Sequence, residues 1–210
     1  MNLHEFDTRE AAGIAVAQRL ATSIEQAVTA DTRAAIALGG GESPKACYRH
    51  LASLPLPWDQ LDVTLTDERV VPDDHPDSNA RMLRECLLFG PAQAAELHPI
   101  DSPNSPVHRT LAGVLLGMGP DGHFASLFPD AANLAAGLKL PNAERVLAVS
   151  TAASPHARIS MTLAALLDTS NLLLMIFGAE KRAVLEQPDD LPVAALLKQT
   201  QTPVDVFWAP

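Results

Sequence analysis

The sequence predicts an α/β fold built around a mostly parallel sheet. Apolar runs of strand length alternate with segments of helical periodicity along the 210 residues, which is the pattern of repeated βα units. Several runs are continuously apolar, as strands are when helices cover both faces of a sheet. Because the chain has no internal repeat and no low-complexity tract, we expect one domain over residues 1–210.

The first predicted helix begins near Asp7. Asp7 and Glu10 have the spacing of a capping box, and apolar residues then recur at helical spacing as far as Val28. The irregular composition of residues 99–108 indicates surface chain and not a linker between domains. The remaining elements are expected as strands at 34–38, 62–66, 112–117, 145–150, 172–177 and 204–208, and as helices at 44–54, 78–88, 156–167, 180–186 and 193–199.

Composition excludes several classes of function. Hydrophobic residues make up 47% of the chain and charged residues 19%, which is typical of a globular protein. The net charge of −10 argues against nucleic acid or an anionic membrane as the main partner, but a local cluster of Arg and Lys can still bind a small anion. The first residues lack the features of a signal peptide, and no apolar run has membrane-spanning length. Cys47 and Cys86 lack metal-site spacing, so we expect reduced thiols in a cytoplasmic protein.

The most informative stretch is residues 115–129. An apolar run stops at Gly117, and the seven residues 117–123 hold three glycines, Asp121 and His123. An acid and a His after a buried strand are typical of a catalytic loop in an open α/β sheet, and His can act as a base near neutral pH. The glycines also match a dinucleotide fingerprint, which we reject. Asp121 would place a negative charge at the pyrophosphate, and Pro129 limits the following helix to about one turn.

A glycine loop at residues 39–44 follows another predicted strand. Ser43 is expected as the N-cap of the next helix, with Pro44 at its first position. Glycines that lead into a helix N-terminus can bind an anion through backbone N–H groups and the helix dipole. A plain connection between a strand and a helix is the alternative.

Three further strand ends carry charged residues. Asp67, Glu68 and Arg69 follow the strand expected at 62–66, and Arg158 and Lys181 each lie in the first turn of a predicted helix. A cation in the first turn of a helix opposes the helix dipole, so a bound anion would explain why Arg158 and Lys181 stand there. The alternative is that both side chains are simply solvated. Together, the five strand ends predict a site for a phosphorylated small molecule. The other histidines show no partner pattern and are expected to be ordinary surface or packing residues: His4, His50, His75, His98, His108 and His156.

Four segments, in this order, carry a family resemblance. They are Ala-Leu-Gly-Gly-Gly-Glu-Ser-Pro at 37–44, Thr-Asp-Glu-Arg-Val-Val-Pro-Asp-Asp-His-Pro-Asp-Ser-Asn at 66–79, the whole of 115–129, and Arg-Ile-Ser-Met-Thr-Leu at 158–163. They resemble the glucosamine-6-phosphate isomerase/6-phosphogluconolactonase family, and in particular its lactonases, and the resemblance runs from near Asp7 to Trp208. It implies a three-layer α/β/α sandwich with a Rossmann-like sheet. The implied reaction is hydrolysis of 6-phospho-D-glucono-1,5-lactone in the oxidative pentose phosphate pathway, without a metal or organic cofactor.

The resemblance also implies residue roles. His123 would activate water or pass a proton to the ring oxygen, and Asp121 would orient His123 or contact sugar hydroxyls. The other implied site residues are Asp67 and Arg69 beside the sugar, and Gly40, Gly41, Ser43, Arg158 and Lys181 around the phosphate. A lactone is already a reactive ester, so positioning and one general base, worth ~10²–10⁴-fold, meet the demand on the site.

The chain departs from the family pattern in three places. Gly39 and Glu42 stand where the family usually has serines, so Glu42 would repel the phosphate unless it points away. Phe124 replaces the usual Thr after the loop His. The segment between Pro99 and Leu111 looks about one helix shorter, which would loosen the fold or promote self-association, and we expect a monomer or a weak homodimer.

Two other functions remain open from the sequence. The first is a deaminase or isomerase acting on amino-sugar phosphates, with Asp67 as the carbon base and His123 in ring opening. Arg69 and the Ser-Leu-Phe-Pro tail after the loop His argue against it. The second is a sugar-phosphate-binding protein without catalysis, which Glu42 and the shortened segment favour.

Overall fold

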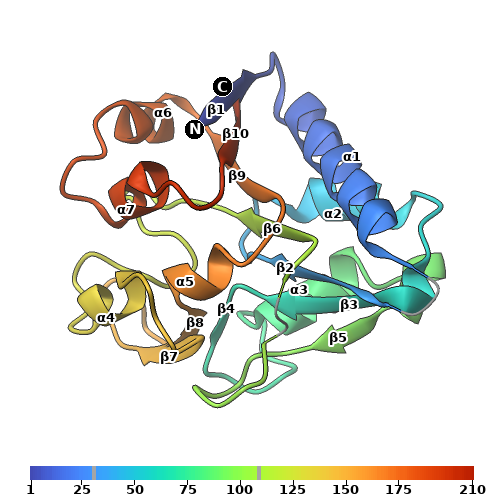
Figure 1. Ribbon diagram of the computed structural model, residues 1–210, viewed down its shortest axis with the longest axis horizontal. Coiled ribbons are helices and arrows are strands. Elements are labelled where there is room, and N and C mark those ends of the chain that lie inside the picture. Colours follow the sequence, from blue (N-terminus) through green and yellow to red (C-terminus); the bar gives the residue numbers. More distant parts are fainter. Residues whose placement is uncertain (30–31, 108–109) are drawn as a thin grey trace.

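The central sheet has seven strands, and every neighbouring pair in it is parallel (Figure 1). The computed structural model describes residues 1–29, 32–107 and 110–210. The expected mostly parallel sheet is therefore confirmed. In spatial order the strands are β1 (Asn2–Glu5), β10 (Val204–Ala209), β9 (Leu172–Phe177), β6 (Gly113–Leu116), β2 (Ala34–Leu38), β3 (Leu61–Leu65) and β5 (Glu96–His98).

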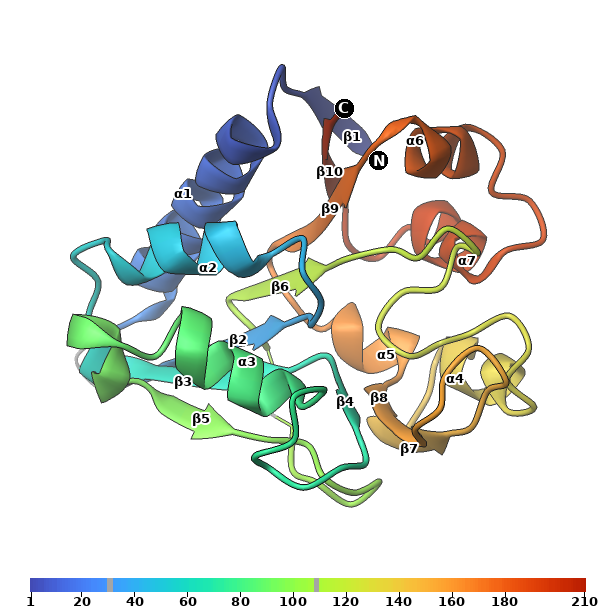
Figure 2. The ribbon, with the colours of Figure 1, turned by 180° about the vertical axis from the view of Figure 1, so that it is seen from behind.

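Helices cover both faces of this sheet, which confirms the three-layer α/β/α arrangement (Figures 1 and 2). On one face lie α1 (Arg9–Ala27), α2 (Lys45–Ala52) and α3 (Asn79–Cys86), and on the other lie α4 (Leu134–Leu138), α5 (Leu163–Leu166), α6 (Ala179–Glu186) and α7 (Pro192–Lys198). Alternate residues of each strand enter the two cores, so Ile36 of β2 packs toward α1 while Ala37 packs toward the opposite layer. Burial on both sides explains the continuously apolar strands.

Three strands form a separate antiparallel sheet beside the carboxyl ends of the central strands. These are β4 (Asp67–Arg69), β8 (Arg158–Met161) and β7 (Val146–Val149), in the order β4-β8-β7. The single helix expected at 156–167 is wrong, because residues 158–161 pair on both sides and only α5 is helical. The Thr162 side chain accepts from the Ala165 N–H at 3.3 Å, so the helix starts after the strand. Tertiary pairing here overrides a helical apolar pattern.

Two expected helix caps are also corrected. Thr8, and not Asp7, caps α1 by accepting a hydrogen bond from the Ala11 N–H at 3.1 Å. Helix α2 begins at Lys45 after Pro44, with no side-chain cap, so Ser43 does not have the capping role that its position suggests. Strands β1 and β5 were not expected, because each is a short edge strand without a continuous apolar run.

The segment between β5 and β6 contains no helix in its described residues, 99–107 and 110–112, which fits the expected shortening. The face of β3 opposite the α1–α2 layer carries polar residues instead of a purely apolar surface. Asp62 there accepts two hydrogen bonds from Arg33, at 2.9 and 2.7 Å, and Thr64 donates to the His98 carbonyl at 2.8 Å. Hydrogen bonding thus satisfies the polar side chains on this face.

Short 3-10 turns at Trp58–Gln60 and Gly90–Ala94 complete the connections. Cys47 and Cys86 are buried and free, as expected, and burial raises the pKa of the Cys47 thiol to about 12. In the described part of the chain, none of the helices combines the length and apolar character that crossing a membrane requires.

Candidate active site

A pocket of about 360 Å³ opens where the loops after β2, β3 and β6 meet the small sheet and the start of α6. Parallel strands end at the same edge of the sheet, so loops far apart in sequence converge there. Eight of the nine expected site residues line it, and the ninth, Asp121, contacts the lining residue His123. The eight are Gly40, Gly41, Ser43, Asp67, Arg69, His123, Arg158 and Lys181.

His123 and Asp121 form a hydrogen-bonded dyad in the loop after β6. The Nδ1 atom of His123 lies 2.5 Å from Oδ1 of Asp121, and the same oxygen accepts from the His123 N–H at 3.3 Å. An ionised carboxylate at this distance places the imidazole proton on Nδ1, which leaves the lone pair on Nε2. The ring also packs against Phe128 with a centroid separation of 4.2 Å. The arrangement is that of an oriented general base.

Glycine at position 119 is required by this dyad. A Cβ atom there would lie 2.2 Å from Cε1 of His123 and 2.5 Å from Oδ1 of Asp121. Gly122 adopts a φ of 73°, and its Cβ would lie 2.7 Å from Leu191. Ala125, which also lines the pocket, has a φ of 47°. The loop around His123 therefore contains two residues with the positive φ angles that most residues disfavour.

The two acidic residues of β4 have different surroundings. Glu68 is buried, and its carboxylate accepts from the backbone N–H groups of Asn79 and Ala80, at 2.7 Å each, and from the Ser78 hydroxyl at 3.1 Å. It also accepts from the Arg69 N–H at 2.7 Å. This carboxylate therefore accepts hydrogen bonds from N–H groups at the start of α3 that have no partner within the helix, and the helix dipole there favours a negative charge.

Asp67 instead lines the pocket, and both of its carboxylate oxygens have hydroxyl donors. Oδ2 accepts from Ser126 at 2.6 Å, and Oδ1 accepts from Thr66 at 3.1 Å. Asp67 itself is 6% exposed. These bonds fix the direction of the carboxylate.

Asn79 is a lining residue that sequence reasoning missed. Its side-chain amide donates to the Asp67 carbonyl at 2.8 Å, and its Oδ1 occupies the space of a Cβ on Gly40, 2.0 Å from that position. Gly40 therefore lacks a side chain because Asn79 packs there.

Arg69 and Arg158 are cross-strand partners in the pairing of β4 with β8. An Nη1 donor of Arg69 bonds the Asp77 carbonyl at 2.6 Å, and Nε of Arg158 bonds the Ser154 hydroxyl at 3.0 Å. Burial, followed by the charge of Arg69, lowers the pKa of Arg158. Neither guanidinium forms an ion pair with a carboxylate of residues 1–29, 32–107 or 110–210. Arg158 thus reaches the pocket from a strand, and the helix-dipole argument for it was wrong.

Lys181 lies in the first turn of α6, as expected, after Gly178 with a φ of 89°. Burial lowers the pKa of Lys181, and the nearby charge of Arg9 lowers it further, against an opposing effect of Glu180. Within the described residues Lys181 has no carboxylate in ion-pair contact. A half-buried lysine without such a partner is suited to an anionic ligand.

Comparisons with known proteins show the family of the chain. The family model described as "Glucosamine-6-phosphate isomerases/6-phosphogluconolactonase" matches residues 7–208. The chain belongs to this family. A 6-phosphogluconolactonase of Caulobacter vibrioides is 40% identical, with 100% of this chain and 97% of that protein covered. The protein of the same name from Mesorhizobium japonicum is 36% identical over 100% of this chain and 95% of its own length.

Solved structures extend the likeness to the fold. A 6-phosphogluconolactonase from Shewanella baltica has a TM-score of 0.92 and 30% identity, covering 100% of this chain and 98% of that one. A monomeric glucosamine-6-phosphate deaminase has a TM-score of 0.74 at 20% identity, over 100% of this chain and 97% of that one, which shows a shared fold. The family membership expected from the sequence is confirmed. The chain is an enzyme of this family, and the curated relatives it matches are lactonases.

Glu42, which was expected to repel a phosphate, has a positively charged neighbour. Its carboxylate forms an ion pair with Lys45, one turn further along the chain, and its side chain is 87% exposed. Gly41, directly before it, has a φ of 97°, a conformation that favours glycine. The expected repulsion of a phosphate by Glu42 is therefore weakened by the adjacent lysine.

Four of the histidines that were expected to lack partners have them, and one of these is His4, whose Nε2 lies 3.4 Å from Oδ1 of Asp205. His156 lies 2.9 Å from Asp77, and the Asp77 N–H donates to Nδ1 of His75 at 3.1 Å, beside the pocket. His98 lies 3.3 Å from Asp62, and His108 is outside the described residues. Two groups have atoms close enough to hold a metal ion: His75 with Asp77 and His156, and Asp62 with Glu96 and His98.

Neither group resembles a prepared metal site. In the first, Nδ1 of His75 already accepts a backbone N–H, and the positively charged Arg69 is bound to the carbonyl of Asp77. In the second, Arg33 donates two hydrogen bonds to Asp62. Both arrangements oppose the charge of a cation.

Proposed function

We propose that the protein hydrolyses 6-phospho-D-glucono-1,5-lactone to 6-phospho-D-gluconate in the oxidative pentose phosphate pathway. One observation carries the proposal. The oriented base His123–Asp121 shares a pocket with Arg69, Arg158 and Lys181, which have no carboxylate in ion-pair contact among the described residues. A base beside an anion site is what a phosphorylated lactone requires, and the names of the relatives agree with it.

The phosphate binds among the loop 39–43 and the cations. Backbone N–H groups of Gly40 and Gly41 and the hydroxyl of Ser43 donate hydrogen bonds, while Lys181 and Arg158 neutralise the charge. Because Glu42 is paired with Lys45, the phosphate loop carries no uncompensated negative charge from this residue. Binding of the phosphate holds the lactone carbonyl at a fixed position relative to His123, and this orientation lowers the barrier to reaction.

At the other end of the pocket, Nε2 of His123 takes a proton from water as the water oxygen attacks the lactone carbonyl carbon. The tetrahedral intermediate then breaks its bond to the ring oxygen, and the protonated His123 returns the proton to that oxygen. Asp121 keeps the ring in the required tautomer and stabilises its charged form. Asp67 and Arg69 line the sugar-binding part of the pocket and contact hydroxyl or ring oxygens.

The names of the curated relatives disfavour the deaminase or isomerase alternative. Two relatives at 40% and 36% identity are lactonases, whereas the deaminase of known structure is 20% identical. The His123–Asp121 dyad likewise disfavours a binding protein without catalysis, because binding alone does not require an oriented base.

The deciding experiment is proton release from freshly generated 6-phosphogluconolactone, measured against its spontaneous hydrolysis. We expect strong acceleration by the protein and no ammonia release from glucosamine 6-phosphate. Tight binding of 6-phosphogluconate without acceleration would instead identify a binding protein. Turnover of glucosamine 6-phosphate would support the deaminase.

A further inference from the structure

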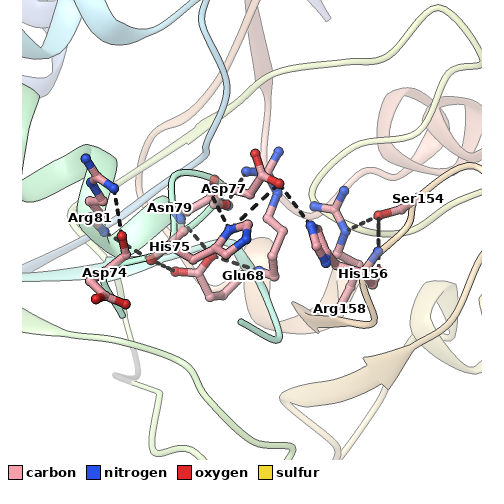
Figure 3. Close-up of polar contacts among 11 residues, drawn as sticks. Glu68, Asp74, His75, Asp77, Asn79, Arg81, Ser154, His156 and Arg158 are labelled. Atoms are coloured by element: carbon pink, nitrogen blue, oxygen red, sulfur yellow. Dashed lines mark hydrogen bonds and ion pairs between the residues drawn. The ribbon is translucent and has the colours of Figure 1, made fainter. Parts of the chain in front are cut away.

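Asp77 connects the two segments that carry the pocket arginines. Its backbone carbonyl accepts from Nη1 of Arg69 at 2.6 Å, and its carboxylate oxygen Oδ2 lies 2.9 Å from Nε2 of His156. His156 precedes Arg158 by two residues. Figure 3 shows Asp77 between His75 on one side and His156 with Arg158 on the other. The contact therefore spans from the loop before α3 to the loop before β8.

Both ends of this contact are held by their own loops. The Asp77 N–H donates to Nδ1 of His75 at 3.1 Å, and the His75 ring meets the His156 ring edge-on at a centroid distance of 5.3 Å. Ser154 accepts from the His156 N–H at 3.2 Å and from Nε of Arg158 at 3.0 Å. Movement of either loop thus displaces an arginine side chain.

The charges also favour this arrangement. The hydrogen bond from His156 is the largest cause of a lowered pKa for Asp77, and the charges of His75, His156 and Arg69 act in the same direction. The carboxylate is therefore ionised through the neutral range. Arg69 and Arg158 repel each other across β4 and β8, and the negative charge of Asp77 beside them reduces that repulsion.

Asp77 stands next to the pocket and not inside it. It lines a neighbouring depression of about 350 Å³ that shares Arg69 and Asn79 with the main pocket. It does not line the main pocket itself, so it acts on a ligand there through the arginines.

We propose that Asp77 and His156 are positioning residues whose contact fixes the direction of the Arg158 guanidinium for the phosphate and of the Arg69 guanidinium for the sugar part of the substrate. The proposal rests on the proposed function, since it assigns both arginines to the phosphorylated substrate. Loss of the contact should weaken ground-state binding and leave the chemistry at His123 unchanged. A change in KM with a constant kcat is the signature of such a role.

The test compares three variants with the unaltered protein. Asp77→Asn keeps the backbone carbonyl on Arg69 but removes the charge, and His156→Ala removes the contact. His156→Gln restores a donor at the position of Nε2. His4→Ala is the matched control, because His4 also contacts an aspartate, Asp205 at 3.4 Å, away from the pocket.

Two quantities are measured for each protein: the steady-state constants for the lactone, and the Kd for 6-phosphogluconate by calorimetry. We expect Asp77→Asn and His156→Ala to raise KM and Kd about tenfold with kcat within about twofold, because an oriented charge-assisted contact is lost. His156→Gln should recover most of the affinity. His4→Ala should match the unaltered protein.

Unchanged KM and Kd in Asp77→Asn and His156→Ala would overturn the proposal, and so would a fall in kcat at constant KM. If His156→Ala does not fold, Asp77→Asn and His156→Gln decide the question. If the unaltered protein binds 6-phosphogluconate without hydrolysing the lactone, the proposed function fails, and the Kd comparison still tests the positioning role. The two failures are therefore distinguishable.

Discussion

His123 and Asp121 meet through Nδ1 and Oδ1 at 2.5 Å, in a space that exists because residue 119 has no side chain. The carboxylate lies two residues before the imidazole, so a single loop supplies both the proposed base and the group that orients it. The cations of the pocket come from three other segments. This division lets binding and proton transfer be tested separately.

Replacement of His123 by Ala should abolish most of the acceleration of lactone hydrolysis. A general base contributes ~10²–10⁴-fold, so kcat should fall by that range while binding of 6-phosphogluconate persists. Proton release against the spontaneous rate measures the effect, and thermal unfolding confirms that the variant folds. Equal acceleration by both proteins would assign the base to Asp67 or Asp121.

Asp121→Asn should lower kcat by about 10²-fold, because the amide can donate to Nδ1 and so favours the tautomer whose proton blocks Nε2. KM should change little, since Asp121 does not line the pocket in which the substrate would bind. The measurement is the steady-state rate with 6-phosphogluconolactone. A kcat equal to that of the unaltered protein would show that the dyad has no part in proton transfer.

Gly119→Ala should also impair kcat, because its Cβ would lie 2.2 Å from Cε1 of His123 and the ring must move. Gly117→Ala is the comparison within the same loop, since nothing lies within 4 Å of its Cβ position. A displacement of the ring should appear as a change in the His123 imidazole signals in an NMR spectrum. Equal kcat values for the two variants would contradict a requirement for glycine at 119.

Lys181→Gln should raise KM for the lactone about tenfold with little change in kcat, because the lost charge acts on the phosphate and not on the carbonyl. Lys198→Gln, at an exposed lysine of α7, is the matched control. A large loss of kcat in Lys181→Gln would place this lysine at the reacting bond.

Binding of 6-phosphogluconate should weaken at alkaline pH. Burial lowers the pKa of Lys181, so its charge is present below that lowered value and is lost as the pH rises through it, before an ordinary lysine deprotonates. Calorimetric Kd values over a pH series measure the effect. The same pH dependence in Lys181→Gln would assign the titration to another group.

Glu68→Ala should lower stability without any direct effect on chemistry. Its buried carboxylate caps α3 through Asn79, Ala80 and Ser78, so its removal should cost about 2–3 kcal/mol of unfolding free energy. Glu85→Ala removes an exposed pair with Arg81 and should cost no more than about 0.5 kcal/mol. Urea unfolding compares them, and equal losses would contradict the capping role.

Local patterns predicted much of the fold and the pocket. Strands β2, β6 and β9 are runs of buried apolar residues, and such runs are visible in one sequence because both faces of the strand are covered. The loop at 117–123 and the lysine after Gly178 follow directly from strands recognised in this way. Their side chains converge because parallel strands end at one edge of a sheet.

Contacts between distant segments escaped prediction. Glu68 and Asp67 are adjacent in sequence, yet one caps a helix 11 residues away and the other is held by Ser126, 59 residues away. The contacts of a strand residue depend on pairing with distant strands. That pairing cannot be seen in the local apolar pattern of 158–161, which therefore appeared helical. Propensity is a weak signal where a strand is only four residues long.

The sequence by itself determined the parallel α/β architecture, the loop that holds both His123 and Asp121, and the family to which the chain belongs, because each depends on residues close together in the chain. Only the tertiary structure decided that Arg158 lies on a strand beside Arg69, that Asn79 occupies the space left by Gly40, and that Asp77 contacts His156 across 79 residues. The physical reason is that buried polar groups must find hydrogen-bond partners, and those partners are chosen by the packing of the whole chain.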